Sequence, residues 1–228
     1  SKSYILKLSI PIFFSNLTVP FVGLVDTSLM GHLSSEKFLA AISISTSVIT
    51  MIFWSFGFLR MGTVGLIAQS LGKNDWNEIT FIFVRNLSLA IIIGLFLVLL
   101  KNPVIFFIEY FFVTSQETKI LINKYISIRI FSAPAELIIY VLAGFYLGLQ
   151  KTVTSSLLIS VYCLMNIIFS LYFVIYLNLE IAGSALGTII SAYLTIFIFL
   201  IFSYFQLKKK FNTYFTFKKI LNQKKCFN

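Results

Sequence analysis

The sequence predicts an all-α integral membrane protein, a bundle of six transmembrane helices, and three observations support this prediction. First, 58% of the 228 residues are hydrophobic and only 11% are charged, whereas about a quarter of the residues in soluble domains are charged. Second, uncharged runs such as 8–25 and 152–179 approach or exceed the roughly 20 residues that a spanning helix needs. Third, these runs lack the alternation of polar and apolar residues that is typical of membrane barrel strands.

Breaks at Gly, Asn, Pro and charged residues divide the chain into six predicted spans. They cover about 4–30, 38–71, 79–100, 120–150, 153–177 and 181–207. Together they form a predicted transmembrane lobe over residues 1–207, followed by a basic cytoplasmic tail over 208–228. The second and fourth spans are longer than the hydrocarbon core requires, so we expect them to tilt or bend. Pro11, Pro20 and Pro134 are the predicted helix bends, because proline removes a backbone donor and crowds the preceding turn.

The distribution of Lys and Arg predicts the orientation of the bundle. On the side of both termini lie 12 of these residues, seven of them in the tail, against four on the other side, which are Lys37, Lys101, Lys119 and Lys124. We therefore expect both termini to be cytoplasmic in a bacterial-type inner membrane. The tail either lies on an anionic lipid surface or is a solvated linker. Because the chain opens on Ser1 and ends amid basic residues, we expect it to be a fragment.

Four ionisable residues fall inside the predicted spans: Asp26, Arg60, Arg129 and Glu136. A charge at bilayer depth costs about 2.5–3.5 kcal/mol on insertion scales, so each needs a partner, water or a function. The helix rise puts Arg60 and Glu136 at similar depths, which predicts a structural pair between them. Arg129 is a candidate partner of Asp26, or could instead extend its guanidinium toward a backbone carbonyl. Asp26 is either a carboxylate that exchanges a proton during transport or a helix-end residue in interfacial water.

Small residues at a spacing of four predict close contacts between helices. They occur as Gly144-x-x-x-Gly148 in the fourth span and as Gly183-x-x-x-Gly187 in the sixth. This spacing is also common by chance, so the prediction needs a structure to test it.

Three segments carry a resemblance to a known family: LSIPIFFSNLTVPFVGLVDTSLMGHL, FWSFGFLRMGTVGLIAQSLG and IRIFSAPAELIIYVLAGFYLGLQ. They resemble the multidrug and toxic compound extrusion (MATE) transporters, and among these the DNA-damage-inducible protein F-like subgroup. The similarity follows all six predicted helices in order. Transporters of this family have two six-helix lobes, so the resemblance implies that this chain is the N-terminal lobe and that a second lobe is its partner.

The resemblance also implies a function, namely export of amphipathic or cationic compounds by a cation-coupled antiporter that works by alternating access. Asp26 matches the first-helix carboxylate tied to cation coupling, and Pro11 matches the proline where that helix bends. Asn166, Ser170 and Thr188 match residues that line the cavity of the lobe. Because Ser170 stands where many relatives have Asp, the polar network is thin, which favours coupling to protons over sodium.

Other functions stay open at this point. A lipid-linked precursor flippase of the same superfamily would need several cations facing a phosphate, and only Arg60 and Arg129 are available. A membrane enzyme would need paired intramembrane Asp, a Ser/His pair or a metal motif, so we expect no enzyme activity, cofactor or bound metal. A truncated half could also lack transport activity, or act as a homodimer. We do not expect a nucleic-acid partner despite the net charge of +10.

Overall fold

The computed structural model describes residues 25, 28–29, 31, 36–112 and 115–210, and the regular structure within them is helical. The elements are α2 (Glu36–Ser55), α3 (Phe58–Gly72), α4 (Trp76–Leu99), α5 (Lys101–Phe111), α6 (Gln116–Arg129), the 3₁₀ turn η1 (Ile130–Ser132), α7 (Ala133–Gly148), α8 (Thr152–Leu171), the π-helical turn η2 (Tyr172–Tyr176) and α9 (Glu180–Lys210). The predicted all-α membrane fold is confirmed.

Five stretches within the described residues are long and apolar enough to cross a membrane. They are Glu36–Gly72, Trp76–Leu99, Gln116–Gly148, Thr152–Tyr176 and Glu180–Lys208, and they coincide with the five spans predicted from residue 38 onward. The first predicted span, 4–30, lies almost wholly outside the described residues. Near its end, Leu29 is buried in the hydrophobic core and Val25 packs against that core.

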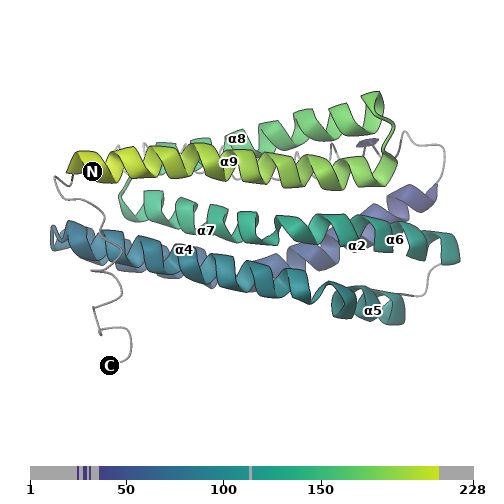
Figure 1. Cartoon of the computed structure of the whole chain (residues 1–228), viewed down its shortest axis with the longest axis horizontal. Helices are drawn as coiled ribbons and strands as arrows, with labels where there is room; N and C mark the ends of the chain where they lie inside the picture. The colour runs from purple at the N-terminus through teal and green to yellow at the C-terminus, as the bar shows by residue number, and fades with distance from the viewer. Residues whose placement is uncertain (1–24, 26–27, 30, 32–35, 113–114, 211–228) are drawn as a thin grey trace, which may run out of the picture.

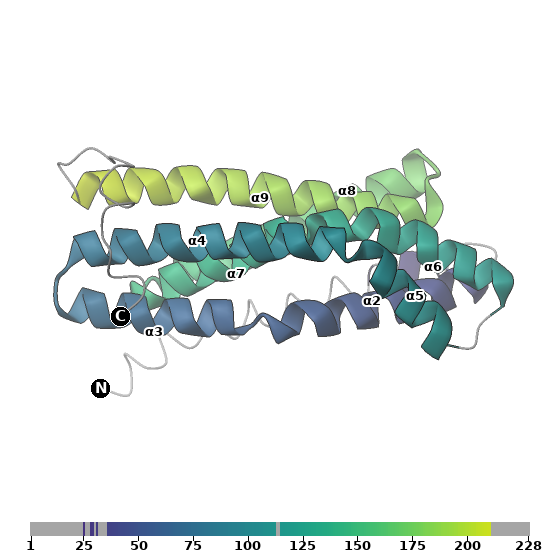
Figure 2. The ribbon, with the colours of Figure 1, turned by 60° about the horizontal axis from the view of Figure 1, so that its bottom comes forward.

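The span Gln116–Gly148 runs through the middle of the bundle. In its most apolar window 78% of the residues are buried, against 28–44% in the other four spans. Its second half, α7, packs against α3, α4, α8 and α9. Figure 1 shows α7 between a layer of α8 and α9 and a layer that contains α4. Figure 2 shows from another side that α7 passes between α3 and α4. This helix is therefore the core around which the others are arranged.

Local signals explain where the spans begin. The Asp75 carboxylate accepts a hydrogen bond of 3.0 Å from the Glu78 N–H at the start of α4. The Ser115 hydroxyl likewise accepts one of 3.3 Å from the Thr118 N–H at the start of α6. Such caps satisfy N–H groups that have no partner inside the helix. The turns between spans use residues with positive φ, which are Asn74, Gln150, Asn178 and Glu180.

A 3₁₀ turn interrupts the central span just before Pro134, which was predicted as a bend and occupies the second position of α7. Pro134 has no N–H to donate to the carbonyl of Ile130, and the Ala133 N–H donates to that carbonyl instead. The Tyr193 hydroxyl of α9 donates to the Phe131 carbonyl, at 3.1 Å. The carbonyls of Ile130 and Phe131 thus both have a partner within the chain, as a membrane environment requires. The predicted bends at Pro11 and Pro20 lie outside the described residues.

Glycines allow α7 to approach α3 closely. A Cβ atom on Gly144 would lie 2.7 Å from the Arg60 carbonyl oxygen, and one on Gly148 would lie 2.6 Å from the Ile67 Cβ. Both distances are too short for a side chain to fit, so the close contact predicted for this glycine pair is confirmed.

The second glycine pair has the same role between α9 and the end of the α8 span. A Cβ atom on Gly183 would lie 2.9 Å from the Phe173 carbonyl carbon, and one on Gly187 would lie 2.7 Å from the Ser170 N. This contact is therefore made largely to backbone. It sets the distance between the polar residues that α8 and α9 carry.

Three features of the fold depart from the prediction. The second span is interrupted at residues 56–57, where the sequence has Gly57 but no charge or proline to mark the break. Residues 101–111, which were left without a predicted element, form α5. The charges of Lys101 and Glu109 and the ring of Pro103 suggested a loop, yet proline is tolerated in the first turn of a helix. In addition, α9 extends to Lys210, past the predicted end at 207.

The close contact between α7 and α3 predicts that Gly144→Ala destabilises the protein. The added Cβ would collide with backbone, which cannot move aside, so we expect a loss of about 1–3 kcal/mol in the free energy of unfolding. Thermal unfolding in detergent measures this loss. Gly65→Ala is the matched control, because a Cβ on Gly65 of α3 meets no described atom within 4 Å. Equal melting temperatures for the two variants would contradict the prediction.

Candidate functional site

Three polar residues that the sequence singled out lie together between α8 and α9. The Asn166 side-chain N–H donates to Thr188 Oγ1 at 2.8 Å, and Thr188 Oγ1 donates to the Ser184 carbonyl at 3.1 Å. Ser170 lies one turn after Asn166 on the same face of α8, against Gly187. Asn166, Ser170 and Thr188 are almost fully buried, with 1%, 0% and 4% of their surface exposed.

Two buried oxygen atoms of this cluster accept no hydrogen bond from the part of the chain that the structure describes. They are Asn166 Oδ1 and Ser170 Oγ. A buried polar atom without a partner costs about 1–3 kcal/mol. Most buried polar atoms in proteins are paired, so two neighbouring unpaired oxygens call for an explanation. With Thr188 Oγ1 nearby, the cluster offers neutral oxygen atoms to a hydrogen-bond donor or to a hard cation.

The cluster continues along α8 to a second polar group. Tyr162 precedes Asn166 by four residues, so Tyr162, Asn166 and Ser170 lie on one face of α8 and form what we call the α8 ladder. The Tyr162 hydroxyl donates to Glu136 Oε1 of α7 at 3.1 Å. The ladder thus connects the α8–α9 cluster to a charged group in the centre of the bundle.

That group is a buried ion pair across the 3₁₀ turn. Arg129 at the end of α6 binds Glu136 of α7, with the guanidinium nitrogen 2.6 Å from Glu136 Oε1. Both side chains are only 12% exposed. Ser132 lies between them in the turn and receives a hydrogen bond from the Arg129 guanidinium. Its hydroxyl proton is shared between the Arg129 carbonyl at 2.8 Å and Glu136 Oε1 at 3.2 Å. The guanidinium also lies over the ring of Phe53 in α2, 5.6 Å from its centroid.

The predicted pairing of Glu136 with Arg60 is therefore wrong, because Arg129 occupies that place. The prediction compared depths along separate helices and assigned Arg129 outward, toward Asp26. It overlooked that residues seven apart in one helix lie two turns apart on nearly the same face. Among the described residues Arg60 has no carboxylate partner, although it interacts electrostatically with Tyr140.

The remaining predicted site residues are placed as follows. Asp26, Pro11 and Pro20 lie outside the described residues. Pro134 lies against α4, where a Cβ on Gly94 would fall 2.3 Å from its Cα. Tyr162 was missed, although its position one turn before Asn166 could have pointed to it. No group of three His, Cys, Asp or Glu residues that could bind a metal occurs within the described part of the chain.

Comparison with known proteins identifies the family. The model of the MatE family matches residues 11–172. The chain belongs to the MatE family. It is 35% identical to DNA damage-inducible protein F of Escherichia coli over 191 residues, which is 84% of this chain and 42% of that protein. It is 23% identical to multidrug export protein MepA of Staphylococcus aureus over 86% of this chain and 44% of that protein. This MATE chain thus spans less than half the length of these relatives.

Solved structures agree on the fold. A MOP superfamily transporter from Pyrococcus furiosus superposes with a TM-score of 0.83 at 21% identity, over 95% of this chain and 47% of that one. An outward-facing multidrug resistance MATE transporter superposes with a TM-score of 0.81 at 22% identity, over the same shares of the two chains. The MATE chain therefore has the fold of about half of such a transporter.

The buried ion pair predicts non-additive effects of mutation. Either Arg129→Met or Glu136→Met alone leaves a buried charge without its partner and should cost about 3–5 kcal/mol of unfolding free energy. The double variant should cost clearly less than the sum, which denaturation of all three variants in detergent measures. The comparison pair is Lys124 and Glu180, 3.9 Å apart and about half exposed, where single changes should cost at most about 1 kcal/mol. Additive losses at Arg129 and Glu136 would contradict this prediction.

The hydrogen bond between α8 and α9 predicts that Thr188→Val destabilises the protein by about 1–3 kcal/mol, because the buried Asn166 amide then loses its acceptor. Thr195→Val is the control. Thr195 is equally buried but its hydroxyl donates only to the Ser191 carbonyl of its own helix. Removing the Thr195 hydroxyl therefore leaves no side chain of another described helix without its hydrogen-bond partner. The melting temperatures of the two variants measure this difference. A Thr195→Val variant as unstable as Thr188→Val would contradict the stabilising role of the hydrogen bond between Asn166 and Thr188.

Proposed function

We propose that this MATE chain forms the N-terminal lobe of a cation-coupled antiporter that exports amphipathic or cationic compounds by alternating access. The observation that carries the proposal is the buried cluster of Asn166, Ser170 and Thr188, which presents unpaired oxygen atoms inside a membrane bundle. Membership of the MatE family supports it. Relatives named as multidrug export proteins match over most of this chain but less than half of their own length, so a second six-helix lobe is proposed as the partner.

Asp26 is the proposed coupling residue, and the proton is the proposed ion. Protonation of Asp26 from outside would remove its charge and change its hydrogen bonds to Asn166 or Ser170. This change would favour a bent first helix, with Pro11 and Pro20 as the bends, and a smaller cavity that expels the substrate. Loss of the proton to the cytoplasm would reset the cycle. Sodium is the less favoured ion because the cluster brings hydroxyl and amide oxygens but no second carboxylate from the described residues.

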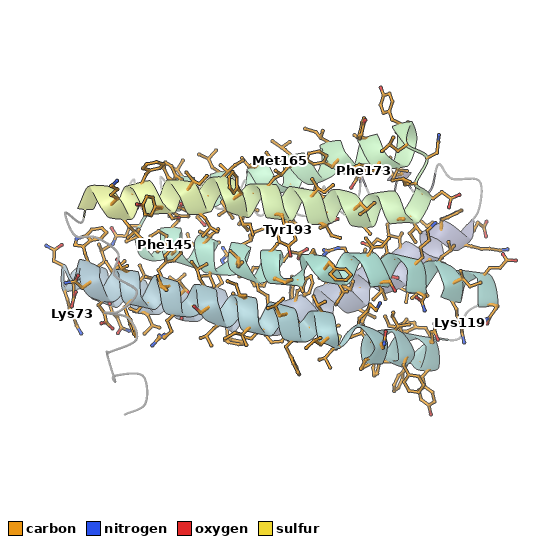
Figure 3. The ribbon with its side chains drawn as sticks, viewed as in Figure 1. Lys73, Lys119, Phe145, Met165, Phe173 and Tyr193 are labelled. Atoms are coloured by element: carbon orange, nitrogen blue, oxygen red, sulfur yellow. The ribbon has the colours of Figure 1, made fainter. Side chains whose placement is uncertain are left out.

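The proposed location is a bacterial-type inner membrane with both ends of this segment in the cytoplasm. Figure 3 shows Lys73 and Lys119 at opposite ends of the bundle. Lys73 directly follows α3, Lys151 directly precedes α8, and Lys208 lies near the end of α9. The three residues therefore lie at the same end of the bundle. That end would face the cytoplasm because the basic tail follows it. Lys37, Lys101, Lys119 and Lys124 would then face outward.

The proposal is tested by transport into and out of proteoliposomes that contain the native gene product. With a proton gradient directed opposite to ethidium movement, the wild type should transport ethidium, and Asp26→Asn should lose most of this transport. Asn166→Ala should lower it as well, because it removes an oxygen and an amide from the cluster. Cys163→Ser is the control, since Cys163 is buried on α8 but outside the α8 ladder.

A sodium gradient imposed without a pH difference shows whether sodium or the proton drives transport. Transport driven by sodium alone would overturn the proton assignment but keep the antiporter. An Asp26→Asn variant that transports at the normal rate would overturn the proposed role of Asp26. Absence of transport with every gradient, in a protein of native length, would overturn the exporter itself.

A further inference from the structure

The short helix α5 presents an aromatic surface where two spans end. It follows directly on the span Trp76–Leu99 and precedes the span that starts at Gln116. Its inner face buries Ile105 and Ile108. Its outer face exposes large rings, which belong to Phe106, Phe107, Tyr110 and Phe111. Figure 2 shows that α5 leaves the direction of α4 at this end of the bundle.

Exposed aromatic rings at the ends of spans are typical of the boundary between hydrocarbon and headgroups. The rings of α5 also form pairs, with centroids 6.3 Å apart for Phe106 and Tyr110 and 4.4 Å apart for Phe107 and Phe111. Rings arranged in this way form a surface suited to acyl chains. Because α5 lies where two spans end and exposes Tyr110, we place it near the boundary between the hydrocarbon and the headgroups.

An open hollow of about 600 Å³ lies at this level between α5 and α6. Its lining residues are Glu109, Gln116, Lys119, Ile120, Asn123 and Lys124. The lining thus combines two ammonium groups, one carboxylate and two amides. Figure 3 shows Lys119 at the end of the bundle where α5 and α6 meet.

We propose that this hollow binds the headgroup of a phospholipid that carries both a phosphate and a primary ammonium, as phosphatidylethanolamine does. Lys119 and Lys124 would bind the phosphate oxygens, and Glu109 would accept hydrogen bonds from the ammonium. Lys124 lies 3.9 Å from Glu180, and an ammonium has three N–H donors, so it can serve both partners. The acyl chains would lie along the exposed rings of α5.

The mixture of charges selects this class of lipid over others. A purely anionic headgroup would bring no cation to Glu109. A trimethylated headgroup would bring a cation that cannot donate a hydrogen bond to the carboxylate. A primary ammonium can donate to Glu109 while the phosphate of the same headgroup binds the two lysines. This site does not depend on the proposed transport function.

Native mass spectrometry of the delipidated native gene product tests the proposal. The protein is mixed with equal amounts of phosphatidylethanolamine, phosphatidylglycerol and phosphatidylcholine that have the same acyl chains. We expect retention of phosphatidylethanolamine to exceed that of each other lipid by up to about fivefold, the upper limit for one exposed charged contact. Lys119→Gln combined with Lys124→Gln should remove this preference. Glu109→Gln should abolish the discrimination against phosphatidylcholine.

Lys73→Gln, at the opposite end of the bundle, is the matched control and should keep the wild-type preference. Equal retention of the three lipids by the wild type would overturn the proposal, and this measurement does not depend on any variant folding. Stronger retention of phosphatidylglycerol would show a site for anionic lipid instead and would also overturn it. The proposal would also be overturned if the variant with both Lys119→Gln and Lys124→Gln kept the preference for phosphatidylethanolamine and had the wild-type melting temperature.

Discussion

The central span must pass through the bundle without leaving a backbone group or a charge unpaired, and much of the structure follows from this constraint. Water cannot satisfy polar groups in the hydrocarbon region, so each must find its partner in protein. Where Pro134 removes a donor, a tighter turn and the Tyr193 hydroxyl supply the missing hydrogen bonds. Where Arg129 enters the interior, Glu136 neutralises it and Ser132 bridges the two. The unusual local structure and the ion pair thus occur together.

The same constraint explains why the α8–α9 cluster stands out. Around the ion pair, the polar groups are shared among several partners, including Tyr162 from α8 and the ring of Phe53 from α2. One turn further along α8, Asn166 is only partly satisfied and Ser170 is not satisfied by the described residues. The α8–α9 cluster therefore has two neighbouring oxygen atoms that are available to a further hydrogen-bond donor.

The sequence was sufficient for those features that depend on composition along one helix. Charges and turn residues located the spans from residue 38 onward, and the glycine spacing located the contacts of α7 and α9. It was insufficient where the outcome depends on which faces meet. Depth alone could not choose between Arg60 and Arg129 as the partner of Glu136, since helix rotation decides the choice. The interruption at Gly57 and the helix α5 also depend on packing that no local pattern records.

The placement of Arg129 and Glu136 on one span has a consequence for how the chain enters the bilayer during synthesis. If the two charges belonged to different spans, each would enter the lipid without its counter-charge. Arg129 and Glu136 lie two turns apart on the same face, so these two buried charges of the span neutralise each other. The cost of insertion then falls on a dipole instead of on two separate ions. The central helix therefore brings the counter-charge of Arg129 with it into the membrane.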